Sequence, residues 1–149
     1  MIHLRNFEDY IREGIVTKQR SDTSRAASLR EEAVQRKAFV KEMQKKIGVR
    51  NEYANYFVEN AYDILMELIR AKLFIDGFKA AGSYAHEAEV SYLRKLGFRE
   101  PDVRFINELR YFRNGIVYYG KKIDADYATT ILKFLDEIFP KLEKLLGMN

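Results

Sequence analysis

Residues 51–76, NEYANYFVENAYDILMELIRAKLFID, carry the pattern from which the fold class follows. Apolar side chains recur at helical spacing along this stretch, and they form a stripe broader than a helix on the protein surface needs. A stripe of this width is typical of a central helix that other helices contact on more than one side. Asn51 is the predicted N-cap of this helix, and Gly77 is the residue that ends it.

Helical patterns flank this stretch on both sides. The expected helices cover residues 24–47, 83–97, 101–119 and 124–145, and residues 3–16 are expected to form a short helix or an arm. Ser83 and Asp124 are the predicted caps. Glu67 and Arg70 are spaced so that they can pair, and a kink or break is expected at Pro140. With 8 Gly and 2 Pro in 149 residues, turns are few, and the chain lacks the β-branched runs that a parallel α/β fold requires. We therefore predict an all-α fold, an antiparallel up-and-down helical bundle.

Composition excludes several classes of protein. Apolar residues make up 47% and charged residues 32%, which is typical of a globular domain. The absence of Cys excludes disulfides, thiolate metal sites and a cysteine nucleophile, and two histidines are too few for a histidine metal cluster. We expect no metal and no cofactor. No apolar run reaches the roughly 18 residues of a membrane span and no signal peptide is visible, so we expect a cytoplasmic protein with no membrane partner.

Charge is distributed unevenly along the chain. Residues 1–50 hold 12 Lys and Arg against 7 Asp and Glu, a net charge of +5, whereas residues 51–149 hold 14 against 15, a net charge of −1. We predict two parts, a basic N-terminal helical arm (1–50) that packs on a helical bundle (51–149). The arm's charge indicates either a solvated helix face or a surface for nucleic acid or an acidic partner.

The predicted helix over residues 101–119 has two faces rich in large side chains. The face assigned to the bundle core carries Phe105, Leu109, Phe112, Ile116 and Tyr119. The opposite face carries Val103, Ile106, Arg110, Arg113, Asn114, Val117 and Tyr118. Because a helix that only coats a monomer carries charged residues there, this second face is expected to contact something. The two candidates are a second copy in a homodimer and the chain's own N-terminal helices.

The arginines of this second face suit an anionic ligand. Guanidinium presents a planar fork of donors that matches phosphate, nearby tyrosines would stack bases, and Lys121 and Lys122 would hold a nucleic-acid backbone. The alternative is that Arg110 and Arg113 form structural ion pairs with Glu67, Glu87 or Glu108. Gly115 within the helix is explained most simply by the close approach of another backbone.

The run LRYFRNGIVYYGKKID (residues 109–124) resembles the HEPN family, the higher eukaryotes and prokaryotes nucleotide-binding domain. The family's signature is an Arg followed by a polar residue, often Asn, then a short spacer and a His near the end of the penultimate long helix. Arg113 and Asn114 match the first two positions, and Tyr118 stands where a three-residue spacer places the His. The signature His is therefore replaced by Tyr in this chain.

Two upstream segments are also similar to archaeal and bacterial members, YDILMELIR (residues 62–70) and GSYAHEAEVSYLRKLGF (residues 82–98). The resemblance covers about residues 51–147 and implies a HEPN-like bundle of four to five helices that forms homodimers. Active members are metal-independent endoribonucleases, often toxins of toxin–antitoxin pairs, whose composite site is formed by both copies of the dimer. Many work beside a minimal nucleotidyltransferase encoded as a separate chain.

The replaced His bears on the chemistry that the resemblance implies. Histidine titrates near neutral pH and serves as acid or base, whereas a Tyr with a pKa near 10 is a poor base there. An Arg still holds phosphate and stabilises charge in the transition state. The resemblance assigns Arg113, Asn114 and Tyr118 to the catalytic positions. Together with the basic and aromatic neighbours, it gives a ligand-binding set of Arg110, Arg113, Asn114, Tyr119 and Lys121.

Three hypotheses about function follow. The first is a dimeric module that binds RNA, a nucleotide or another anion, with weak or no catalysis. The second is a metal-independent endoribonuclease that uses Arg113 with Tyr118, Tyr119 or His86. The third is a structural helical adaptor whose dimer face is its whole function. A metal site built from His86, Glu87 and Glu89 is not expected, because adjacent and i+2 positions of a helix do not converge on one ion.

Overall fold

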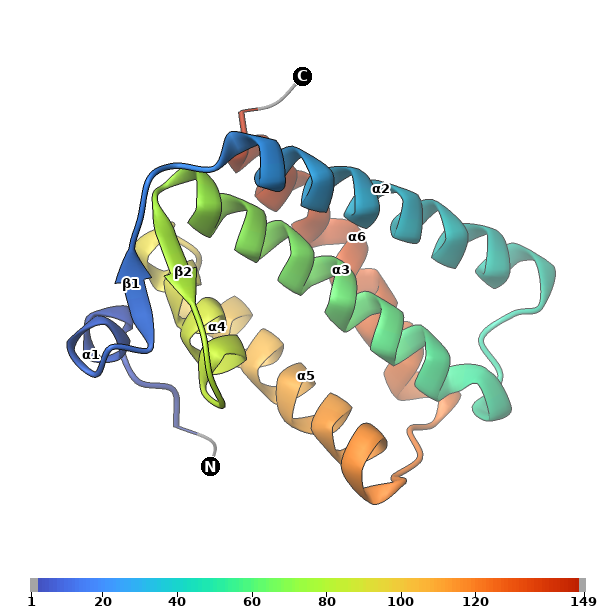
Figure 1. Cartoon of the computed structure of the whole chain (residues 1–149). Helices are drawn as coiled ribbons and strands as arrows, with labels where there is room; N and C mark the ends of the chain where they lie inside the picture. Colours follow the sequence, from blue (N-terminus) through green and yellow to red (C-terminus); the bar gives the residue numbers. More distant parts are fainter. Residues whose placement is uncertain (1–2, 148–149) are drawn as a thin grey trace.

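Six α-helices and one pair of short strands make up residues 3–147, the part of the chain that the computed structural model describes. In chain order the elements are α1 (Phe7–Arg12), β1 (Val16–Lys18), α2 (Thr23–Lys46), the 3₁₀ turn η1 (Asn51–Tyr53), α3 (Ala54–Ile75), β2 (Phe78–Ala80), α4 (Ala85–Lys95), α5 (Glu100–Tyr119) and α6 (Ala125–Leu145). The long helices run back and forth as an antiparallel bundle, which confirms the all-α fold class (Figure 1). Within these residues, no helix combines the length and apolar character that a membrane crossing requires.

Helix α3 is the centre of the bundle, as its broad apolar stripe predicts. It packs against α2, α4, α5 and α6, and Figure 1 shows α2 above it, α6 behind it and α5 below it. Ile64, Leu65, Leu68 and Ile69 have no exposed surface. Since burying one such side chain stabilises a fold by about 1.5–3 kcal/mol, this helix contributes much of the hydrophobic free energy that stabilises the core.

The N-terminal third joins the same core through α2. Ala26, Ala33 and Val40 of this helix are buried with the side chains of α3. Most of its cations are paired with carboxylates of other helices, through the ion pairs Arg30–Glu143, Arg36–Glu67, Lys37–Asp136 and Lys41–Asp136. The local excess of positive charge in residues 1–50 is therefore largely balanced in space.

The predicted pairing of Glu67 with Arg70 is wrong. Glu67 accepts from Arg36 of α2, and burial raises the pKa of Glu67 against the opposing effect of that guanidinium. Arg70 is bound instead by Glu89 of α4. The two residues are one turn apart on α3, but each lies closer to a partner on a neighbouring helix than to the other.

The strands β1 and β2 were not expected from the sequence. They pair antiparallel, with Val16 opposite Ala80 and Lys18 opposite Phe78. Gly77 ends the preceding helix as predicted, with φ of +84°, and a Cβ at this position would lie 2.8 Å from the carbonyl oxygen of Gln19. Strands of three residues are too short for an alternating pattern to indicate them.

The ends of the helices follow the sequence in part. Asp124 caps α6 as predicted, since its side chain accepts from the amide of Tyr127 at 2.8 Å. The expectations for Ser83 and Asn51 are wrong: α4 has Tyr84 at its N-cap position without a side-chain cap, and residue 51 lies in η1. Of the kink or break expected at Pro140, the break is absent, because α6 continues through this residue to Leu145.

Helix α5 buries more of its surface than predicted. Val103 and Ile106, assigned to the outer face, have no exposed surface, because α5 packs against α3 and α4 of its own chain on that side. On the other side Phe105 stacks on Phe134 of α6 with ring centroids 4.3 Å apart. Tyr119, assigned to the core, is 80% exposed, since α5 ends at this residue beyond the reach of its neighbours.

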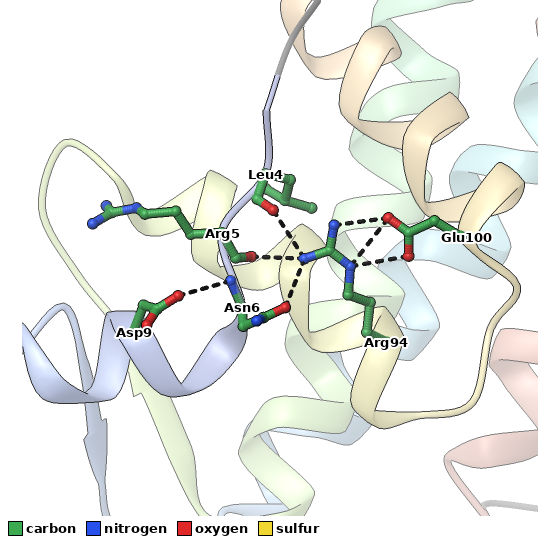
Figure 2. A network of polar contacts seen from close by, with 6 residues as sticks. All are labelled: Leu4, Arg5, Asn6, Asp9, Arg94 and Glu100. Carbon is green, nitrogen blue, oxygen red and sulfur yellow. Dashed lines mark hydrogen bonds and ion pairs between the residues drawn. The ribbon is translucent and has the colours of Figure 1, made fainter.

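The guanidinium of Arg94 ties three segments of the chain together (Figure 2). It donates to the carboxylate of Glu100 at the start of α5, to the carbonyl oxygens of Leu4 and Arg5, and to the side-chain oxygen of Asn6. All these acceptors surround the planar guanidinium, whose five N–H donors are enough to bond them. This contact fixes the turn between α4 and α5 against the N-terminal segment.

We predict that Arg94→Ala lowers the free energy of unfolding by about 2–3 kcal/mol, because several charge-assisted hydrogen bonds are lost and their acceptors stay partly buried. Arg94→Lys recovers only part of this loss, since an ammonium lacks the planar fork. Urea denaturation followed by circular dichroism measures the change. The matched control is Arg99→Ala, whose exposed ion pair with Asp102 is worth at most about 0.5 kcal/mol. Equal losses in the two alanine variants would contradict the prediction.

Candidate functional site

A cavity of about 580 Å³ lies between the start of α4 and the C-terminal half of α5. We call it the central cavity. From α5 it is lined by Arg110, Arg113, Asn114 and Tyr118, and from α4 and the preceding loop by Ser83, Tyr84, His86 and Glu87. Four of the residues predicted from the sequence therefore line one cavity. They do so because positions three, four and eight residues apart share one face of a helix.

An ion pair between α3 and α4 places the start of α4 against this face. Arg70 donates from Nε and Nη2 to the two oxygens of Glu89, at 2.6 and 2.9 Å, and Glu89 is only 2% exposed. The hydrogen bonds to this carboxylate raise the pKa of Arg70. His86 lies one turn before Glu89, so the same pair brings the imidazole to the central cavity.

The two arginines of the central cavity are not neutralised. Arg110 donates from Nε to the side-chain oxygen of Asn107 at 3.0 Å, and neither Arg110 nor Arg113 forms an ion pair with a carboxylate of residues 3–147. The guanidinium carbon of Arg113 lies 5.5 Å from the ring centroid of Tyr62, and its buried Nε has no hydrogen-bond partner in the described chain. The alternative of structural ion pairs is therefore wrong, and both groups retain their charge for an anion.

His86 contacts the same tyrosine as Arg113. Its Nδ1 lies 3.1 Å from the hydroxyl oxygen of Tyr62, which is 1% exposed. Burial lowers the pKa of His86, against the opposing effect of Glu89, and this direction favours the neutral imidazole. When Nδ1 carries the proton and donates to Tyr62, Nε2 is left as an acceptor, which is the state that a general base requires.

The remaining predicted residues, Tyr119 and Lys121, line a neighbouring cavity of about 330 Å³ at the end of α5. We call it the tip cavity, and it shares Asn114 and Tyr118 with the central cavity. Within residues 3–147, the atoms that come nearest to a Cβ at Gly115 belong to a side chain and not to another backbone. A Cβ at Gly115 would lie 3.1 Å from the side-chain Cδ of Lys121, so the glycine makes room for a lysine stem.

Asn55 at the start of α3 holds the loop that carries this lysine. Its side-chain amide donates to the carbonyl oxygen of Lys121 at 2.9 Å and accepts from the amide of Ile123 at 2.8 Å. Asn51 acts in the same way, because its side-chain oxygen accepts from the amide of Ala125 at 2.8 Å. The two asparagines thus fix the loop between α5 and α6 instead of capping α3.

The site contains groups that the sequence pattern around α5 does not identify. Tyr62 comes from α3, and Tyr84 and His86 come from the loop before α4 and from α4 itself. The endoribonuclease hypothesis includes His86, but no sequence spacing relates this residue to Arg113. Across residues 3–147, no three His, Asp or Glu side chains gather as they would around a metal ion.

A pH titration tests the environment of His86. We predict an NMR titration midpoint below the ordinary value of about 6.5, because burial disfavours the charged imidazole. Since the unfolded chain then binds this proton more readily, the unfolding free energy falls as the pH drops from 7 through the lowered pKa. His86→Gln removes this part of the pH dependence, and His3→Gln assigns the signals. A midpoint at or above 6.5 would contradict the burial described here.

Comparison with known proteins adds no relative to this description. No family model, no curated protein and no solved structure matches the chain. The family resemblance of residues 109–124 therefore stays a prediction from the sequence, and the function of the site is argued from its geometry.

Proposed function

We propose that the protein binds RNA or a nucleotide through a phosphate group held in the central cavity, with weak or no catalysis. The observation that carries this proposal is the pair of guanidinium groups, Arg110 and Arg113, that line one cavity without an ion pair in residues 3–147. Glu87 is the one carboxylate in the lining, so the cavity has a formal charge of +1 with His86 neutral.

The surroundings of these arginines favour a nucleotide over a simple anion. Tyr84 and Tyr118 line the cavity and are 56% and 69% exposed, so both present ring surface on which a base can stack. The guanidinium carbon of Arg5 lies 5.9 Å from the ring centroid of Tyr84, so Arg5 occupies part of that ring's surroundings. Asn114 adds an amide that both donates and accepts hydrogen bonds. The resemblance of residues 109–124 to the HEPN signature supports the same proposal, because Arg113 and Asn114 are the two positions that match it.

We predict that Arg113→Gln weakens binding of a fluorescein-labelled single-stranded RNA octamer by about 10-fold or more at 50 mM salt. Loss of a charge-assisted contact is worth about 1.5–3 kcal/mol, which corresponds to this change in Kd. Fluorescence anisotropy measures the binding. Lys133→Gln is the control, since Lys133 is exposed on α6 and lines none of these cavities, and we expect its effect to stay below about 2-fold.

Two outcomes would overturn the binding proposal. One is an equal effect of Arg113→Gln and Lys133→Gln. The other is binding that does not change between about 50 and 300 mM salt, because phosphate contacts weaken steeply with salt. The second outcome favours the structural adaptor.

A metal-independent endoribonuclease is the second candidate, and the position of His86 favours it. His86 and Arg113 line one cavity and both contact Tyr62, although they come from different helices. In such a reaction His86 takes the proton of a 2′-hydroxyl, whose oxygen attacks the adjacent phosphorus. The bond from phosphorus to the 5′-oxygen breaks, that oxygen takes up a proton, and Arg113 stabilises the charge on the phosphate.

For this second candidate we predict cleavage of mixed-sequence RNA in the presence of EDTA, with 2′,3′-cyclic phosphate ends. His86→Gln and Arg113→Gln should each reduce the rate at least about 100-fold, in line with the usual contribution of acid–base catalysis. Gel electrophoresis and mass spectrometry of the products provide the measurement. Absence of metal-free cleavage, or cleavage that His86→Gln leaves unchanged, would exclude His86 as the base and leave binding as the function.

The homodimer and the nucleotidyltransferase partner stay predictions. Two apolar residues of the face expected to form a dimer, Val103 and Ile106, are covered by α3 and α4 of the same chain. The apolar part of that face that remains exposed is Val117, at 46%. The central cavity has both arginines and His86 within one chain, so the proposed binding does not require a second copy.

A further inference from the structure

A second basic cavity lies on the other side of His86. Its volume is about 370 Å³, and its lining includes Arg25 from α2, Arg70 and Glu89, and Phe78 and Lys79 from β2. We call it the strand cavity. No residue of this cavity except His86 was singled out as a site residue from the sequence, because it combines α2, α3, β2 and α4.

Two cations of the strand cavity are free of carboxylates. Glu89 is engaged by Arg70 through two hydrogen bonds, whereas Arg25 and Lys79 are exposed and form no ion pair with residues 3–147. The guanidinium carbon of Arg25 lies 4.7 Å from the ring centroid of Phe74, which holds it over an aromatic face. With three cations and one carboxylate, the cavity has a formal charge of +2.

The three cavities are neighbours in series, and together we call them the furrow. Gly82 and His86 line both the strand cavity and the central cavity, and Asn114 and Tyr118 line both the central cavity and the tip cavity. The furrow therefore runs from Arg25 in α2 to Lys121 after α5, with His86 between its first two parts.

The net charge of the residues that line the furrow equals the net charge of the chain. Its lining has six cations, Arg25, Arg70, Lys79, Arg110, Arg113 and Lys121, and two carboxylates, Glu87 and Glu89, which gives 6 − 2 = +4. The whole chain has 26 cations and 22 carboxylates, also +4, so the other 20 cations are balanced by the other 20 carboxylates. The lining of the three cavities is therefore net positive, and the residues outside it carry equal numbers of cations and carboxylates.

We propose that this furrow binds a single-stranded RNA along its length, with backbone phosphates at Arg25 and Lys79, at Arg110 and Arg113, and at Lys121. This inference rests on the proposed function and names its ligand as a strand of several nucleotides. One phosphate satisfies one of the three positions, whereas a strand supplies phosphates in succession. Exposed tyrosines lie between and beside the cationic positions, namely Tyr84, Tyr111, Tyr118 and Tyr119, and stacking on them requires unpaired bases.

The test compares ligand lengths in two charge-matched variants. Arg25→Gln/Lys79→Gln removes the cations of the strand cavity, and Lys133→Gln/Lys141→Gln removes two exposed cations of α6 that line none of the three cavities. Fluorescence anisotropy is measured with labelled AMP, a dinucleotide, a tetramer and an octamer of one RNA sequence. All four substituted side chains are exposed, and circular dichroism confirms folding.

We expect the strand-cavity variant to bind the octamer about 5–20-fold more weakly and to bind AMP as the wild type does. The slope of log Kd against log salt for the octamer should fall by about 1.4, since each phosphate contact on a single strand contributes about 0.7. The α6 variant should change neither the Kd for the octamer nor the Kd for AMP by more than about 2-fold. An RNA duplex of the same length should bind more weakly than the single strand.

Three outcomes would overturn the proposal that a single strand binds along the furrow. The first is an equal effect of the two double variants on binding of the octamer. The others are a duplex that binds as tightly as the single strand and an affinity that does not rise with the length of the RNA. Arg113→Gln separates this failure from that of the proposed function. If Arg113→Gln still weakens every ligand, phosphate binding at the central cavity stands and only the extended path is excluded. If it weakens none of them, both proposals are excluded.

Discussion

The buried ion pair between Arg70 and Glu89 is the contact on which the arrangement of the site depends. It joins the central helix α3 to α4 through two hydrogen bonds, and Glu89 is almost fully enclosed. A buried carboxylate that loses its partner destabilises a protein strongly, so α4 is fixed on α3 at this point. His86, one turn earlier, is thereby held beside Tyr62 and opposite Arg113. The pair also borders the strand cavity, where it neutralises one arginine and leaves Arg25 and Lys79 free.

Helix α3 serves both the core and the site. One side of it buries the aliphatic residues that hold the bundle together. The same helix supplies Tyr62, which contacts His86 and Arg113 of the central cavity, and Arg70, which lines the strand cavity. At its start, Asn55 fixes the loop that carries Lys121. Because these groups belong to one rigid and buried element, the three cavities are positioned by the same packing that stabilises the fold.

The position of a cation in the fold, and not its position along the chain, decides whether it has a carboxylate partner. From the sequence, the basic N-terminal third is either a solvated helix face or a binding surface. In the structure, α2 pairs Arg30, Arg36, Lys37 and Lys41 with carboxylates of α3 and α6. The cations of the furrow come instead from α2, α3, β2, α5 and the loop after α5, and most of them belong to the part of the chain whose net charge is −1. The net charge of a stretch of sequence does not show which cations are unpaired, because side chains form ion pairs across helices.

The sequence by itself determined the features that depend on neighbours one or two turns away. Helical spacing predicted the helices, the central position of α3 and the shared face of Arg110, Arg113, Asn114 and Tyr118, and local capping chemistry predicted Asp124. The tertiary structure alone decided the pairing of β1 with β2 and the burial of Val103 and Ile106. It also decided that Glu67 and Arg70 each pair with a residue of another helix and not with each other. It also decided the meeting of His86 with Arg113. These features join residues that are distant in the chain or lie on different helices, and their contacts depend on how whole helices pack, which no local periodicity specifies.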